Sequence, residues 1–88
     1  MAYSPENLAE LDVLMQFNLA SSLEGIKIHH TASPALIAAA QRLFDRGFIT
    51  LADGGYLTAL GIRAAEYAQH LFTLLNAEAE SVLANNLG

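Results

Sequence analysis

The histidines and serines are the first residues to consider for chemistry. His29 and His30 are adjacent, so on an extended segment their rings point to opposite faces and cannot both bind one ion. A zinc site needs three or four ligands, and no spacing rule joins His70 and a carboxylate to either ring. The pair Ser21-Ser22 and Ser33 have neither a histidine base nor a glycine elbow beside them. These residues predict neither a metal site nor a nucleophile.

The other polar motifs favour structural roles. The run Asp53-Gly54-Gly55 lacks the lysine and the helix start of a phosphate-binding loop, and it is typical of a tight hairpin turn. The carboxylates lie near helix ends on polar faces, where they solvate the chain. There are no cysteines, which excludes disulfides and thiolate metal sites. We therefore expect no enzyme activity, no cofactor and no metal.

The charges are few and unevenly placed. The net charge is -5, which opposes a general affinity for nucleic acid. All four cations lie in the middle of the chain, between acidic ends, and leave a weakly positive centre. If nucleic acid is bound, we expect mainly phosphate contacts, made by Lys27, Arg42, Arg46 and Arg63, with Gln41 able to reach a base edge.

A first helix is predicted from Pro5 to Leu19 or Ala20, because Ser4 can cap it and proline suits the first turn. Val13 and Phe17 lie four apart on one side and form a second apolar face. The main core-facing stripe is expected to be Leu8, Leu11, Leu14, Met15 and Leu19.

A second helix is predicted from Pro34 to Arg46, capped by Ser33 and stopped by Gly47. Its buried side is expected to be Leu36, Ile37, Ala40, Leu43 and Phe44. Its solvent side is expected to be Ala35, Ala38, Ala39, Arg42, Asp45 and Arg46. The three alanines of that side offer smooth surface for another helix as much as for a DNA groove.

Strands are predicted at Ile26–His29 and in a hairpin from Phe48 to Leu57 that turns at Asp53-Gly54. The final helix is expected to start after the cap Thr58, to reach about Asn76 and to fray through Leu83. Ala65 and Phe72 lie off its main stripe, which is Leu60, Ala64, Tyr67, Leu71, Leu74 and Leu75.

These elements predict one domain over residues 1–84 and a disordered tail over 85–88. The fold class is α+β, mostly α: a winged-helix-like arrangement of about three helices with a small antiparallel sheet. The chain starts without the pattern of a signal peptide, and no apolar run reaches membrane-spanning length. We expect a soluble cytoplasmic protein without a membrane partner.

The segment Leu43-Phe44-Asp45-Arg46-Gly47-Phe48-Ile49, followed by Tyr56-Leu57-Thr58 and Gly61, resembles the end of bacterial winged-helix repressors of the phenolic-acid and multiple-antibiotic-resistance types. The resemblance implies a recognition helix, a wing and a C-terminal helix that helps dimerise. The whole chain is also similar to a family of small uncharacterised proteobacterial proteins.

Two departures separate the chain from DNA-binding members of the repressor families. Between Ile28 and Pro34 there is no room for the first helix of a helix-turn-helix pair. The wing is cut to a short turn with Asp53 at its tip, where a DNA-contacting wing usually carries a cation. Two functions therefore stay open: a DNA-binding or transcription-associated role, and a protein-interaction module that keeps the winged fold as scaffold.

Surplus apolar surface predicts a homodimer. Each long helix has a complete stripe and a second apolar face besides, which a two-fold interface would cover. The expected interface residues are Val13, Phe17, Ala65 and Phe72, together with the alanine face of the second helix, Ala35, Ala38 and Ala39.

Overall fold

A computed structural model describes residues 1–21 and 23–77 of the chain. Within them the elements follow in the order α1 (Pro5–Leu14), β1 (Ile26–Lys27), α2 (Pro34–Asp45), β2 (Ile49–Leu51), β3 (Gly54–Leu57) and α3 (Ala59–Leu75). The predicted fold class is confirmed: three helices and a three-stranded antiparallel sheet, in a layout consistent with a winged-helix-like arrangement. The predicted fraying of the last helix through Leu83 and the tail 85–88 lie outside the described residues.

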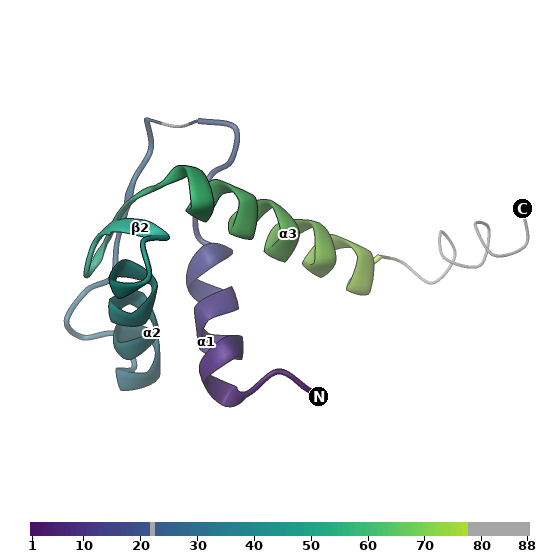
Figure 1. Cartoon of the computed structure of the whole chain (residues 1–88), viewed down its shortest axis with the longest axis horizontal. Helices are drawn as coiled ribbons and strands as arrows, with labels where there is room; N and C mark the ends of the chain where they lie inside the picture. The colour runs from purple at the N-terminus through teal and green to yellow at the C-terminus, as the bar shows by residue number, and fades with distance from the viewer. Residues whose placement is uncertain (22, 78–88) are drawn as a thin grey trace, which may run out of the picture.

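The arrangement in space sets α3 apart from the other helices. In Figure 1, α1 and α2 stand side by side, and the hairpin lies at the end of α2. The last helix crosses one end of α1, and its C-terminal half projects beyond the rest of the described chain.

The three predicted helix caps are confirmed. The Ser4 hydroxyl accepts a hydrogen bond from the Asn7 amide at 3.0 Å, and Ser33 and Thr58 do the same at the starts of α2 and α3. Each hydroxyl satisfies an amide that has no partner inside its helix. Gly47 ends α2 with a φ of 82°, as expected.

The sheet has the order β1-β3-β2. The predicted strand Ile26–His29 is shorter than expected, because the chain leaves the sheet after the Ile28 amide bonds to the Asp53 carbonyl at 2.7 Å. The hairpin turns one residue earlier than predicted, at Ala52-Asp53, and the pairing of β2 with β3 is irregular between Ile49 and Leu51. Gly54 and Gly55 both have positive φ there. No helix lies between β1 and α2, as expected for this described segment.

The prediction that the first helix reaches Leu19 or Ala20 is wrong, because α1 ends at Leu14. The Gln69 side chain of α3 donates hydrogen bonds to the carbonyls of Leu14 and Phe17, at 3.2 and 2.7 Å. These bonds satisfy carbonyls that an ended helix leaves without partners. The chain then turns and places the Phe17 ring in the core.

The core lies between α1, α2, the sheet and the first half of α3. Val13, Phe17 and Ala65 are buried in it, so the expectation that they form surplus exposed faces is wrong. Leu14 is buried as predicted, whereas Leu8, from the expected core stripe of α1, is 52% exposed. The buried face of α1 is the one that α2 and α3 both cover, and it is not the face that carries most of the leucines.

Helix α2 is also rotated from the prediction. Ala39, expected in solvent, is fully buried beside Ala40 and Leu43, while Ile37 and Phe44 are each more than a third exposed. A small residue at this position lets α1 and α2 approach closely, which a larger side chain would prevent.

Helix α3 contacts the core through its smallest residues, Gly61, Ala65 and Ala68. A Cβ at Gly61 would overlap the carbonyl of Phe48, so the helix start lies directly against the chain that enters β2. Four residues of the predicted stripe, Leu60, Tyr67, Leu74 and Leu75, are instead exposed, whereas Leu71 is half-buried and Ala64 packs against the core.

Candidate interaction surface

Two of the predicted phosphate-binding cations, Arg42 and Arg46, are engaged with Glu10. The Arg42 Nε donates to the Glu10 Oε2 at 2.6 Å, and Arg46 Nη1 lies 3.8 Å from Oε1. Arg42 Nη2 also donates to the carbonyl of Glu6 at 3.2 Å. These arginines at the end of α2 thus connect α2 to α1, and the single Glu10 carboxylate offsets part of their positive charge.

Glu10 is the one buried charged residue of the described chain, with 8% exposure. Desolvation by burial raises the pKa of this carboxyl group. The hydrogen bonds from Arg42 and Asn7 and the positive charges of Arg42 and Arg46 together lower it by a larger amount. The net result is a pKa below the ordinary value for glutamate. The carboxylate is therefore ionised at neutral pH and holds both arginines.

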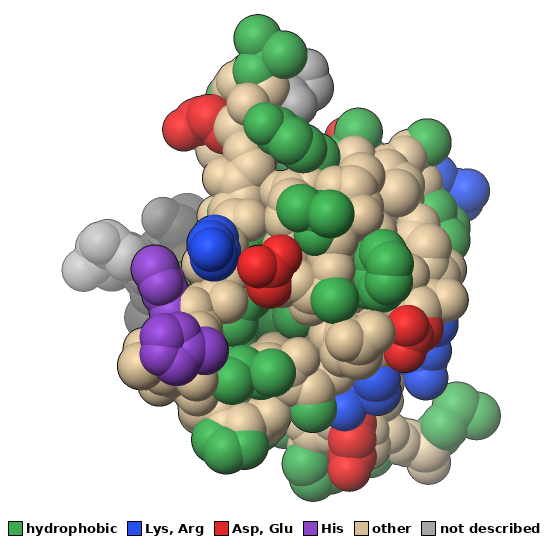
Figure 2. Space-filling model, turned by 90° about the vertical axis from the view of Figure 1, so that its left-hand side faces the viewer, with side chains coloured by type: hydrophobic (Ala, Val, Ile, Leu, Met, Phe, Trp, Pro, Cys, Tyr) green, Lys and Arg blue, Asp and Glu red, His purple; other side chains and the backbone are tan. Residues whose placement is uncertain are grey.

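The other nucleic-acid candidates do not complete a basic patch. Gln41 donates to the Asp45 carboxylate at 2.9 Å, within α2. Lys27 is on β1 and Arg63 on α3, and both are exposed. Figure 2 shows Lys and Arg side chains in separate places on one face of the molecule, several beside acidic ones.

The alanine face of α2 is smaller than predicted. Ala35 and Ala38 are exposed, but Ala39 is fully buried in the core. Two methyl groups offer little area for a partner, and the exposed Ile37 and Phe44 lie elsewhere on the helix.

A larger apolar surface lies where α3 passes α1. An open groove of about 350 Å³ separates α1 from the C-terminal half of α3. We call it the α1–α3 groove; it is lined by Leu8, Leu11, Asp12, Met15, Ala68, Leu71, Phe72 and Leu75. Asp12 is the single charged residue in this lining.

The part of α3 beside the groove carries no charge. From Tyr67 to Ala77 the sequence contains no Asp, Glu, Lys or Arg. Tyr67, Phe72, Leu74 and Leu75 are all more than half exposed. A helix end that only met water would be expected to carry charged residues on its outer face.

The core-facing stripe of α3 continues past the core itself. Gly61, Ala65 and Ala68 are buried, and Phe72 follows with the same helical spacing. Phe72 is nevertheless 53% exposed, because α3 has by then passed beyond α1. Four residues outside the alanine face were predicted as interface residues: Val13, Phe17, Ala65 and Phe72. Of these four, Phe72 is the one that lies at the surface.

Sequence reasoning assigned Leu8, Tyr67, Leu74 and Leu75 to a core that does not include them. The signal that could have identified them is the series of small residues at 61, 65 and 68. Small residues permit close contact between a helix and its neighbour, whereas large ones on the adjacent face must then point away.

Other site types find no support in the described chain. Across residues 1–21 and 23–77, no three His, Asp or Glu side chains gather in a way that could hold a metal ion. None of the helices described combines the length and apolar character needed to cross a membrane. The expectations of no enzyme activity and of a cytoplasmic location stay predictions.

Comparison with known proteins gives a family without an assigned role. A family model described as a family of unknown function (DUF5669) matches residues 1–76. No curated protein and no solved structure matches the chain.

Proposed function

The chain belongs to a family of unknown function (DUF5669), and from its surface we propose that it is a protein-interaction module that pairs with a second copy of itself. The observation that carries this proposal is the stripe of α3 that is buried at Ala65 and Ala68 and then continues, exposed, to Phe72. A helix face that is buried in the core over part of its length and then continues into solvent is suited to form a shared core with a partner. The winged-helix-like layout serves as the scaffold that holds α3 at its angle.

The exposed apolar area reaches more than half of what one partner contributes to a typical interface. Leu8, Tyr67, Phe72, Leu74 and Leu75 are each 52 to 75% exposed. Their exposed parts amount to about 500 Å², against about 800 Å² that each partner contributes to a typical interface. The half-buried neighbours in the groove lining add to this area. An apolar area of this size is in the upper part of the range of about 300 to 600 Å² for the largest patch of a monomer, and such patches are often functional.

A second copy is the partner that this surface fits. The face has both a groove and, beside it, the projecting leucines of the α3 end. In a two-fold contact the α3 end of each copy would occupy the groove of the other, because an isologous interface uses the same patch twice. The absence of charge from Tyr67 to Ala77 matches the charge-depleted centre of interfaces.

Light scattering coupled to size exclusion tests the proposal. We expect twice the mass of the chain at high micromolar concentration. Leu75→Glu should shift the protein to the monomer, because it places a charge in the proposed contact. Leu23→Glu is the matched control: Leu23 is 85% exposed in the loop after α1, and the variant should remain a dimer.

The outcome that would contradict self-association is a monomer at all concentrations. An equal effect of the two glutamate variants would also contradict the assignment of the surface. Circular dichroism of both variants establishes that each is folded, so that a loss of mass reports association.

Nucleic-acid binding is the second candidate function. The order helix, hairpin and helix in a winged-helix-like layout favours it, as does the Arg46 side chain, which is 59% exposed at the end of α2. The net charge of -5 and the ion pair of Arg42 with Glu10 both reduce the electrostatic attraction between this chain and a nucleic acid.

A further inference from the structure

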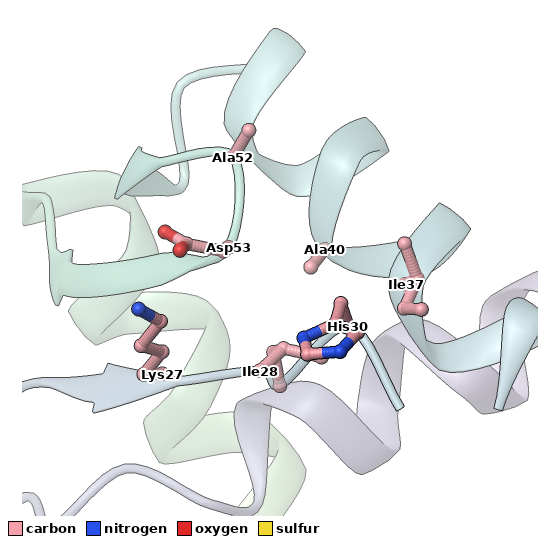
Figure 3. A pocket seen from close by; sticks show the side chains of 7 residues that line it. All are labelled: Lys27, Ile28, His30, Ile37, Ala40, Ala52 and Asp53. Carbon is pink, nitrogen blue, oxygen red and sulfur yellow. The ribbon is translucent and has the colours of Figure 1, made fainter. Parts of the chain in front are cut away.

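A second cavity lies between β1, the segment that follows it, α2 and the hairpin turn. It has a volume of about 360 Å³, at the small end of the range for ligand pockets. Figure 3 shows its lining: Lys27, Ile28, His30, Ile37, Ala40, Ala52 and Asp53. None of these residues belongs to the α1–α3 groove.

Charged and apolar groups occupy different sides of this cavity. In Figure 3, Lys27 and Asp53 lie on one side, and the α2 residues Ile37 and Ala40 lie on the other with His30 beneath them. Ala40 is fully buried and forms part of the floor, while Ile37 is 38% exposed at the rim. The same grouping of basic, acidic and histidine side chains beside apolar ones appears on the face shown in Figure 2.

The two charges at the rim are neighbours without being partners. Within the described residues, the ion pairs all involve Glu10, so Lys27 and Asp53 are not bridged. Their backbones are nevertheless fixed together, since Lys27 pairs with Gly54 and the Ile28 amide donates to the Asp53 carbonyl. The segments that carry this cation and this carboxylate are thereby held side by side.

The turn that carries Asp53 has little freedom to move. Gly54 has a φ of 129°, and a Cβ at this position would come within 2.5 Å of the Ile26 carbonyl oxygen. The segment that carries His30 is closed by a bond from the Ala32 amide to the His29 carbonyl at 2.9 Å. The backbone segments that carry Asp53 and His30 are therefore positioned before any ligand arrives, which lowers the entropic cost of binding.

We propose that this cavity binds a small zwitterion with a short apolar side chain, of the α-amino acid class. The carboxylate of the ligand pairs with Lys27 and accepts a hydrogen bond from His30, and its ammonium group pairs with Asp53. The apolar side chain lies against Ile37, Ala40 and Ala52. A ligand with a single charge would leave one rim group without a partner. This inference does not depend on self-association.

Titration of the isotope-labelled chain with L-leucine, followed by amide chemical shifts, tests the assignment. We expect saturating shifts at residues 27–30 and 52–54. Two matched probes keep the leucine side chain and only one of its two charged groups. The first, 3-methylbutylamine, lacks the carboxylate, and the second, 4-methylpentanoate, lacks the ammonium group. Each should bind about tenfold more weakly than leucine, because one charge-assisted contact is lost.

Two variants test the rim charges separately. Lys27→Met and Asp53→Asn should each weaken leucine binding about tenfold. Asparagine suits the same turn, so Asp53→Asn keeps the hairpin. The charge-matched controls are Arg63→Met and Glu66→Gln on α3, outside the cavity lining, and both should bind leucine as the unmodified chain does.

The probe series on the unmodified chain keeps the test decisive even if a variant fails to fold. Leucine shifts that do not saturate, or that spread over residues away from the cavity, would overturn the proposal. Equal binding of leucine and its two half-probes would overturn it too, since the paired charges would then play no part.

Discussion

Glu10 of α1 forms the ion pairs that join α1 to Arg42 and Arg46 at the end of α2. Its carboxylate is 10% exposed, and it holds Arg42 at 2.6 Å. A buried acid with two cationic neighbours stabilises the fold only while it is ionised. Its pKa in the folded chain is below its ordinary value of about 4.5, so its contribution is fully present at neutral pH. The contribution is lost as the pH falls through the lowered pKa.

Glu10→Gln should lower the free energy of unfolding by about 1 to 2 kcal/mol at pH 7, because the charge-assisted bonds to Arg42 are weakened. The difference from the unmodified chain should shrink as the pH falls below about 4.5, where the glutamate of the unfolded chain also protonates. Urea unfolding at a series of pH values measures both effects.

Glu66→Gln is the control for this change, because it makes the same chemical change at an exposed carboxylate on α3 that lies outside the α1–α3 groove. Its effect on the free energy of unfolding should stay within about 0.5 kcal/mol. A pH-independent loss in Glu10→Gln would show that packing, rather than ionisation, is what the residue contributes.

At the scale of single elements, the helix starts were predictable and the helix faces were not. Ser4, Ser33 and Thr58 act on amides three residues away, so the sequence contains the whole signal. The hairpin depends in the same way on glycines next to its turn. Local chemistry of this kind does not change when the rest of the fold is assembled.

The buried faces depend on residues far along the chain. Helix α3 is apolar over a broad part of its circumference, and the helical periodicity predicted that its large apolar residues face the core. The fold instead buries Gly61, Ala65 and Ala68, which allow α3 close to α1 and to Phe48. The pairing of Glu10 with Arg42 spans 32 residues, and no local spacing reveals it.

The rotation of α2 can be tested with two adjacent alanines. Ala39 is fully buried and Ala38 is exposed. Ala39→Leu should lower the free energy of unfolding by about 1 to 3 kcal/mol, since the added methylenes have no space between α2 and α1. Ala38→Leu makes the same chemical change on the solvent side and should have an effect within about 0.5 kcal/mol.

Thermal or urea unfolding of both variants makes the comparison. Small and equal effects would contradict the placement of α2, because they would match the orientation predicted from periodicity, in which both alanines face solvent.

At the scale of the whole molecule, charge and apolar surface point to different partners. The cations are few, separated and partly neutralised, while several exposed apolar residues of α3 lie together in its uncharged C-terminal part. An acidic chain with a net charge of -5 repels a polyanion at long range. The same charge also maintains solubility despite the exposed α3 face.

Titration of a labelled DNA duplex at low salt should give affinity weaker than about 10⁻⁴ M, below the usual range for non-specific binding. Glu10→Gln should strengthen binding at low salt, because it removes the carboxylate that neutralises Arg42 and Arg46. Fluorescence anisotropy over a salt series measures both. Tight binding that is lost on charge reversal of the two arginines would establish the nucleic-acid function instead.

The bonds from Gln69 to the end of α1 have a consequence for the order of folding. Gln69 follows Leu14 by 55 residues and Phe17 by 52. A helix of ten residues is marginal by itself in water, and closing so long a loop is slow. During synthesis, α1 therefore leaves the ribosome before α3 and reaches its final form only after α3 has been made. Whatever displaces α3 also releases the carbonyls at the end of α1, so the two helices at opposite ends of the domain should gain and lose their order together.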